Sequence, residues 1–458
     1  MGIDLTKGNP LTVILRFTLP LFIGNVFQQL YNMADTIIVG HFVGQDALAA
    51  VGSTGTIMFL VLGFSMGLTS GFAVLTSQRY GARDPKGVKI SVANGILLSV
   101  ILIIVLTAVS LLSMKPLLRL MNTPEAIFQD AYTYISIICM GIVCSVFYNL
   151  FSALLRAIGN SRVPLYFLVF SACLNVVLDL VLIIAGHLGV AGAAIATDIS
   201  QGISAFLCMI YIWKKVRELV PEKNMWTIHP QATAAQLNVG LPMALQFAIT
   251  ASGTVIMQAA INLFGATAVA AYTAANKLQN VITQGMLSMG ETMASYGGQN
   301  YGKGDAQRIR KGVRAALMAE VVYSLFSMAV VWCLLRPALG LFFASDVNID
   351  DMLPWAGVYL HTCSFFYIPL SMIFIFRNIM QGCGYGFLPM MGGVVEFFCR
   401  LLMAALAMHF MIYRLAAFCD PFAWLGAGLF TAVAYRYVIR RVEKTLGGSY
   451  TGTDAQTE

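Results

Sequence analysis

Residues 11–42 read "LTVILRFTLPLFIGNVFQQLYNMADTIIVGHF", a mostly apolar run that contains one proline, Pro20, and one carboxylate, Asp35. About twenty apolar residues suffice for a helix to cross a bilayer, so this run is long enough to span one. Pro20 removes one intrahelical hydrogen bond and lets the helix bend. An ionisable side chain at membrane depth is costly, and by default it marks a functional site. The segment therefore predicts a bendable transmembrane helix with a functional acid.

The composition of the whole chain agrees with this segment. Of its 458 residues, 58% are hydrophobic and 11% are charged, whereas about a quarter of a soluble domain is charged. We therefore predict an all-α polytopic membrane protein. The nine cysteines include no CxxC pair, so neither a disulfide framework nor a resident metal site is expected. The net charge of +7 comes largely from basic residues in short loops, which argues against a nucleic-acid partner.

Apolar runs bounded by glycine, proline and charged residues predict about twelve membrane spans. They lie near residues 11–41, 47–78, 90–114, 130–155, 163–186, 190–213, 236–263, 267–298, 312–335, 353–377, 387–412 and 420–440. Basic residues cluster after every second span, and the positive-inside rule places those loops and both termini in the cytoplasm. The first run is too long for the core of a cleavable signal peptide.

The two halves of the sequence resemble each other. The matched segments are "FTLPLF" with "VGLPMA", "GQDALAAVG" with "GATAVAAYT", "SQRYGARDPKGVKISV" with "GQNYGKGDAQRIRKGV", and "GNSRVP" with "GYGFLP". Six spans per half give both copies the same orientation, which is typical of parallel transporter repeats. We expect six-helix lobes at 1–213 and 236–445, a cytoplasmic linker at 214–235 and a disordered tail at 446–458. An amphipathic helix on the membrane surface is the alternative for the linker.

These motifs resemble the multidrug and toxin extrusion (MATE) family. The resemblance is carried by the Leu-Pro in the first span of each half, by "ALAAVG" and by the loops "QRYGARD" and "QNYGKGD". It covers nearly the whole chain and looks closest to prokaryotic branches whose ion site lies in the N-terminal lobe. It implies two pseudo-symmetric lobes of six helices around a central cleft, in a bacterial inner membrane.

Six carboxylates lie at the predicted membrane depth: Asp35, Asp179, Asp198, Glu291, Glu320 and Glu396. At 1.5 Å per residue, Asp35 in the first span and Asp179 in the fifth both lie roughly 10 Å below the outer surface. Asn175 shares a helical face with Asp179, and Thr197 reaches the same depth in the sixth span. These four side chains predict a hydrogen-bonded box whose oxygen atoms also suit Na⁺.

The resemblance implies that the same four residues form a proton or sodium site. Burial and a nearby second acid both favour the protonated form of a carboxyl group. An ion arriving from outside would therefore neutralise the pair, repack the box and bend the first helix at Pro20. The repeat counterparts of Asp35 and Asp179 are Ile256 or Met257 and Ala404, none of them acidic, so coupling is expected in the first lobe alone.

Other candidate residues have structural or substrate-binding roles, or a role with two alternatives. Asp198 either assists the ion site or faces another helix, and Glu396 and Arg400, four residues apart, are expected to form a structural pair. Candidate residues of a substrate cavity are polar, aromatic or methionine side chains, since such surfaces suit varied cationic ligands. They are Gln28, Tyr31, Asn32, Met33, Gln246, Met257, Met286, Met289 and Glu291.

These observations predict a monomeric secondary antiporter that exports organic cations and other amphipathic drugs in exchange for H⁺ or Na⁺. No GxxxxGK[ST] motif occurs, so an ion gradient must supply the energy, and no cofactor is expected. Its other partners are membrane lipids. One alternative is a flippase for a lipid-linked precursor, which would favour a cationic cavity. Another is an intramembrane enzyme, for which the scattered histidines offer no catalytic arrangement.

Overall fold

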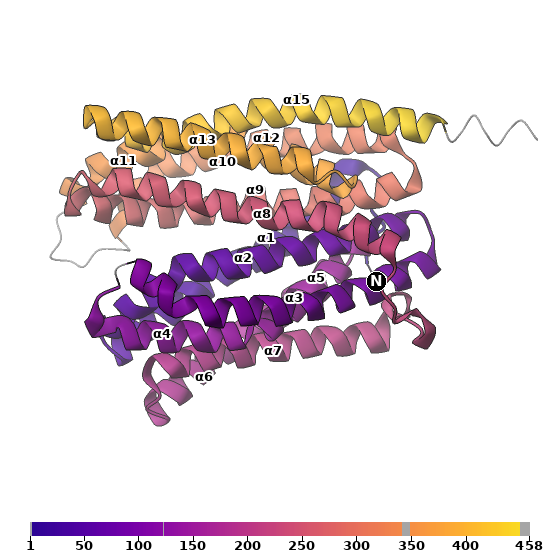
Figure 1. Cartoon of the computed structure of the whole chain (residues 1–458). Coiled ribbons are helices and arrows are strands. Elements are labelled where there is room, and N and C mark those ends of the chain that lie inside the picture. Colours follow the sequence, from indigo (N-terminus) through magenta and orange to yellow (C-terminus); the bar gives the residue numbers. More distant parts are fainter. Residues whose placement is uncertain (1, 122, 341–348, 449–458) are drawn as a thin grey trace, which may run out of the picture. The chain divides into compact units, whose positions relative to one another are not determined.

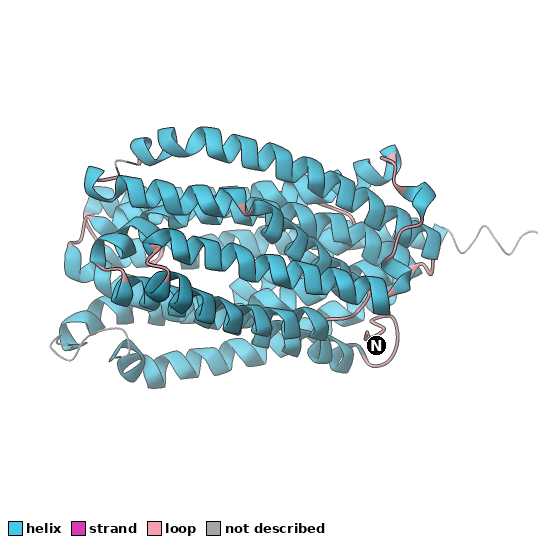
Figure 2. Cartoon of the chain, turned by 90° about the horizontal axis from the view of Figure 1, so that it is seen from below, coloured by secondary structure: helices cyan, strands magenta, loops and turns pink. Residues whose placement is uncertain are grey.

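The computed structural model describes residues 2–121, 123–340 and 349–448. These residues form helices joined by short loops, and no strand occurs among them (Figures 1 and 2). A helix satisfies its backbone hydrogen bonds internally, which hydrocarbon surroundings demand. The predicted all-α class is therefore confirmed.

The α-helices are α1 (Pro10–Phe42), α2 (Gln45–Gly81), α3 (Pro85–Leu120), α4 (Glu125–Met140), α5 (Ile142–Ala157), α6 (Arg162–Leu180), α7 (Gly189–Lys215), α8 (Pro230–Asn262), α9 (Ala266–Lys303), α10 (Ala306–Gly340), α11 (Ile349–Ser364), α12 (Tyr367–Gly382), α13 (Phe387–Phe410), α14 (Tyr413–Ala417) and α15 (Cys419–Gly448). A π-helix, Val181–Ala185, continues α6, and two 3₁₀ helices, Arg217–Leu219 and Lys223–Met225, follow α7.

Within the described residues, 9 helices are long and apolar enough to cross a membrane, or up to 11 if two bent pairs each count as one span. The predicted span at 267–298 forms part of α9, which is long but is not among these apolar helices. Polar side chains along α9, such as Lys277, Gln279 and Glu291, account for its lower hydropathy.

The predicted spans at 130–155 and 353–377 each contain a bend between two helices. The first consists of α4 and α5, bent by 46° at Gly141, and the second of α11 and α12, bent by 52°. Glycine is a poor helix former, which favours a break at Gly141. In the second pair Pro369 lies in the first turn of α12, where it has no N–H to donate to the preceding turn.

The chain forms two compact units. Unit 1 contains Met1–Asp4 and Leu19–Phe247, and unit 2 contains Leu5–Thr18 and Ala248–Glu458. The boundaries therefore fall inside α1 and α8, whereas the sequence suggested a boundary in the linker. Hydrogen bonds from Arg308 to the backbone oxygens of Lys7 (2.7 Å) and Gly8 (2.9 Å) hold the segment Leu5–Thr18 in unit 2. Of the predicted tail at 446–458, residues from 449 onward lie outside the described part.

The linker packs onto unit 1 as two 3₁₀ turns, not as an amphipathic helix, and α8 begins at Pro230. Beyond the linker, the buried side chain of Gln236 fixes the first turns of α8. The side-chain amide of Gln236 donates to the backbone oxygens of Ser91 (2.8 Å) and Phe72 (3.2 Å) and accepts from Asn94 (2.8 Å). These bonds attach the start of α8 to α2 and α3.

The repeated loops have the same local structure in both units. Gly44 precedes α2 with φ 123°, and Gly265 precedes α9 with φ 90°, a backbone conformation that favours glycine. Asp84 accepts the backbone N–H of Gly87 at 2.8 Å, and Asp305 accepts that of Arg308 at 2.8 Å. Each aspartate thus caps the N-terminus of the helix that follows.

Candidate functional site

The acids expected from the first and fifth spans meet in unit 1. Asp35 lies in α1 and Asp179 in the last turn of α6, and a side-chain hydrogen bond joins their carboxyl groups. The side chain of Asp179 is completely buried. Because an ionised carboxylate can only accept hydrogen bonds, a bond between the two carboxyl groups requires a proton on one of them. The pair can therefore change its charge by losing or gaining that proton.

Thr197 in α7 connects the two helices that carry the acids. Its hydroxyl oxygen accepts a bond from the amide of Asn175 at 3.4 Å and another from the hydroxyl of Tyr31 at 3.4 Å. Asn175 lies one turn before Asp179, and Tyr31 lies one turn before Asp35. The structure thus brings together the four residues of the box, and it adds Tyr31 to the same network.

The winding of the backbone changes directly after Asp179. The α-helix α6 ends at Leu180 and continues as the π-helix Val181–Ala185. Such turns are rare and are frequently found at functional sites. Hydropathy and residue spacing gave no sign of this change, because the segment reads as uninterrupted apolar sequence.

Asp198 points away from the hydroxyl of Thr197, as its position one residue later in α7 requires. Its carboxyl group lies against Gly141, at the break between α4 and α5, where any Cβ would collide with it. It is still close enough to interact electrostatically with Tyr31. Asp198 therefore faces another pair of helices while remaining near the box.

Tyr134 in α4 is a member of this neighbourhood that sequence reasoning missed. Its side chain is buried and interacts electrostatically with Asp35, Asp179 and Asp198. It is one of 18 tyrosines and belongs to no motif. Its depth, just inside the outer end of the predicted fourth span, is the signal that could have identified it.

The oxygen atoms of the box are suited to a small hard cation as well as to a proton. Oδ1 of Asp35 is buried and accepts no hydrogen bond from the described protein groups. Carboxylate, amide and hydroxyl oxygens are the ligands that such cations prefer. The site can therefore bind H⁺ or Na⁺ on chemical grounds, with Asp35 and Asp179 as the charged ligands.

The candidate cavity residues of unit 1 are dispersed over α1 and α8. Gln28 and Asn32 are exposed, Met33 is half-buried and Gln246 is almost fully buried. Gln28 and Tyr31 line a small cavity of about 20 Å³ between α1, α5, α6 and α7. Such a volume accommodates about one water molecule.

The candidate cavity residues of unit 2 lie mostly in its interior. Met257 and Met286 belong to its apolar core, and Met289 is buried with its sulfur 3.8 Å from the hydroxyl of Thr18. Glu291 is half-buried in α9. A role in substrate binding stays a prediction for all of these residues.

Glu396 and Arg400 belong to a larger ionic network in unit 2. Arg400 lies 3.3 Å from Glu396 and 2.9 Å from Asp420, and Arg377 lies 3.9 Å from Glu396. The hydroxyl of Tyr359 donates to Asp420 at 3.0 Å. Asp420 escaped notice because it stands at the edge of a predicted span, where an acid is expected to face water.

Two stretches of the chain, residues 20–181 and 242–406, match the same family model, MatE. The two matches begin at Pro20 and Pro242, the prolines that the repeat pairs with each other. Together they cover more than half of the chain. The internal duplication is therefore a property of the family's own pattern.

The chain is similar to several named transporters. The probable multidrug resistance protein YpnP of Bacillus subtilis is 29% identical over 383 residues, which cover 83% of this chain and 84% of that protein. The FAD transporter of Shewanella oneidensis is 24% identical over 400 residues, 86% of each chain. A MOP superfamily transporter from Pyrococcus furiosus, 24% identical, superposes with a TM-score of 0.89 over 96% of this chain and 98% of that chain. This chain is thus a multi-pass membrane protein of the multidrug and toxin extrusion family, whose members are transporters and not enzymes.

Proposed function

We propose that the protein is a multidrug efflux antiporter of a bacterial inner membrane, driven by inward movement of H⁺ or Na⁺. The hydrogen-bonded pair of Asp35 and Asp179 is the observation that carries this proposal. The names of relatives such as the probable multidrug resistance protein YpnP support the direction and the substrate class. The distribution of basic loops supports cytoplasmic termini.

The coupling ion changes the charge of the pair. A proton or Na⁺ from outside neutralises Asp35 and Asp179, and the bonds around Thr197 rearrange. Pro20 is buried inside α1 and has no N–H to bond to the carbonyl of Arg16, so α1 can bend there. Bending displaces the cationic substrate outward, and loss of the ion to the cytoplasm restores the straight helix.

Coupling is confined to unit 1 in this proposal. The repeat counterparts of its two acids are apolar, and among them Met257 and Ala404 are buried in the core of unit 2. The buried acids Asp420, Glu396 and Glu320 of unit 2 already have ion-pair or hydrogen-bond partners. Asp420 and Glu396 pair with Arg400, and Glu320 accepts a hydrogen bond of 3.0 Å from Ser371.

The substrates we propose are organic cations and other amphipathic compounds. The acidic character of the box favours cationic cargo over the anionic pyrophosphate of a lipid-linked precursor, so the flippase alternative is not favoured. The transport unit we propose is the single chain.

The test is ethidium efflux by the purified full-length chain in liposomes, first under a pH gradient and then under a Na⁺ gradient. We expect one of the two gradients to drive efflux, and Asp35→Asn to abolish the driven part while the protein still folds. Asp46→Asn, an exposed acid in the first turn of α2, is the matched control and should transport normally. Driven efflux that survives in Asp35→Asn would refute the coupling site, and absence of dye movement under both gradients would refute the antiporter.

A further inference from the structure

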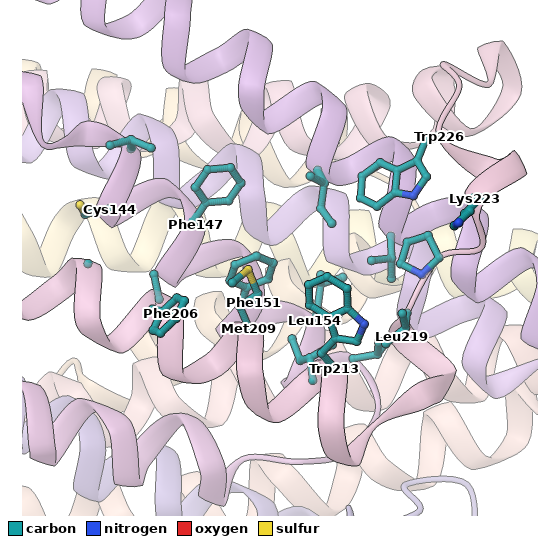
Figure 3. A pocket seen from close by; sticks show the side chains of 18 residues that line it. Cys144, Phe147, Phe151, Leu154, Phe206, Met209, Trp213, Leu219, Lys223 and Trp226 are labelled. Atoms are coloured by element: carbon teal, nitrogen blue, oxygen red, sulfur yellow. The ribbon is translucent and has the colours of Figure 1, made fainter.

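Unit 1 contains a large apolar groove that takes no part in the acid site. It lies between α3, α5, α7 and the linker and has a volume of about 600 Å³ (Figure 3). Its walls are almost entirely apolar, with Phe147, Phe151, Phe206 and Met209 among the lining side chains. A cavity of this size and composition would be filled by hydrocarbon in preference to water.

The groove opens on helix surfaces that would face the membrane. Phe206 is 56% exposed and Trp213 is 66% exposed, and both project from the transmembrane helix α7. Apolar side chains exposed on such helices meet lipid chains. The groove is therefore accessible from the bilayer.

The length of the groove corresponds to one leaflet of the bilayer. Its lining runs from Cys144 to Leu154 along α5 and from Gly202 to Trp213 along α7. At the rise of an α-helix, each run is about 15 Å long. The hydrocarbon core of a bilayer is about 30 Å thick, so the groove matches the depth of a single acyl layer.

The end of the groove at the linker is polar and cationic. Lys223, Trp226 and Trp213 gather there, while Cys144 lies at the opposite end (Figure 3). Tryptophan is enriched at the level of lipid head groups. Lysine side chains at that level attract anionic head groups, at about 1 kcal/mol each.

The neighbouring acid does not neutralise Lys223. Glu222 forms an ion pair with Lys89 at 2.8 Å, and the hydrogen bond from Lys89 holds the pKa of Glu222 below its ordinary value. Among the described residues Lys223 itself forms no ion pair. The charge of Lys223 is therefore available to a ligand at the head of the groove.

We propose that this groove binds an anionic phospholipid from the leaflet on the linker side, with an acyl chain along α5 and α7 and the phosphate at Lys223. The apolar groove, as deep as one leaflet, fits an acyl chain. The cation of Lys223 and the indoles of Trp213 and Trp226 at its mouth fit an anionic head group. A bound lipid would fill the space between the linker and the helices α5 and α7. This site is separate from the coupling acids, so it does not depend on the proposed transport function.

Trp213 and Trp226 provide the test, because brominated acyl chains quench tryptophan fluorescence at close range. The full-length chain is reconstituted into phosphatidylcholine vesicles that contain increasing fractions of brominated phosphatidylglycerol or of brominated phosphatidylcholine. The contribution of the groove is the difference in quenching between the wild-type chain and the Trp213→Phe, Trp226→Phe double variant. We expect half-quenching at about a five-fold lower fraction of the anionic lipid, which is the ratio that about 1 kcal/mol provides.

Lys223→Gln should remove this preference, and Lys215→Gln should retain it. Lys215 is the matched control, because it is exposed at the end of α7 on the same side but does not line the groove. Equal quenching by the two lipids in the wild-type chain would overturn the proposal. So would a preference that Lys223→Gln leaves unchanged, or one that Lys215→Gln removes to the same extent.

Discussion

Nε of Arg400 lies 2.9 Å from Oδ1 of Asp420, and this contact joins α13 to α15 inside unit 2. Both side chains are almost completely buried. Arg400→Leu would leave the charges of Asp420 and Glu396 buried with reduced compensation. Loss of one partner of a buried pair costs about 3–5 kcal/mol, so thermal unfolding in detergent should occur at a markedly lower temperature.

Arg336→Leu is the control for this prediction. Arg336 pairs with Asp350 at 3.0 Å, but their side chains are 65% and 58% exposed. Exposed pairs contribute about 0–1 kcal/mol, so this variant should unfold close to the wild type. Similar shifts in the two variants would mean that Arg400 does not hold the interior of unit 2 together.

Gly71→Ala should destabilise unit 1. A Cβ at Gly71 would collide with the backbone of Gly240, where α2 and α8 pack against each other. Overpacking of this kind costs about 1–3 kcal/mol. Gly55→Ala in the same helix meets nothing within 4 Å and should be neutral or slightly stabilising. Thermal unfolding in detergent compares the two, and equal behaviour would contradict the close approach.

Gln236→Leu should loosen the attachment of α8 to α2 and α3. It removes three hydrogen bonds and leaves buried backbone oxygens and the amide of Asn94 with fewer partners. The expected loss of stability is about 1–3 kcal/mol. Gln231→Leu, an exposed position in the first turn of α8, is the comparison and should change little. Amide hydrogen exchange at the start of α8 measures the effect directly, and unchanged protection would disprove it.

Thr197→Val should weaken ion coupling while it preserves the shape of the side chain. The hydroxyl of Thr197 is lost, and with it the hydrogen bonds that it accepts from Asn175 and Tyr31. A loss of about 1.4 kcal/mol shifts the ion concentration for half-maximal efflux about ten-fold. Thr36→Val, an exposed position in α1, should transport like the wild type. An unshifted ion dependence in Thr197→Val would exclude the hydroxyl from the ion site.

Helix type, approximate spans and the meeting of Asp35 with Asp179 could be predicted from the sequence. Hydropathy locates a span, and the helical rise converts a position within it into a depth, so acids of equal depth can be recognised without a structure. The role of Asp420 could not be predicted, because uncertainty of a few residues in a span boundary decides whether an acid is buried. Asp420 lies next to Pro421, where a helix start in water and one in protein look alike.

The bends at Gly141 and before Pro369 were also outside the reach of hydropathy. Both lie within continuous apolar sequence, and glycine occurs at 41 positions, most of which do not interrupt a helix. The space that Gly141 leaves for Asp198 depends on a contact between α7 and the α4–α5 break, which only tertiary structure supplies. Tyr134 was missed for the same reason, since its importance comes from its neighbours.

The division of α1 and α8 between the two units has a consequence for the origin of the duplicated chain. Leu5–Thr18 packs in the unit formed by the second repeat, and the first half of α8 packs in the unit formed by the first. In a protein made of one such repeat, the beginning of the first helix would have no second unit in which to pack. Two separate copies would have to exchange the first parts of their first helices, as in domain swapping. Separate subunits could lose this exchange on dilution, whereas fusion into one polypeptide makes it permanent.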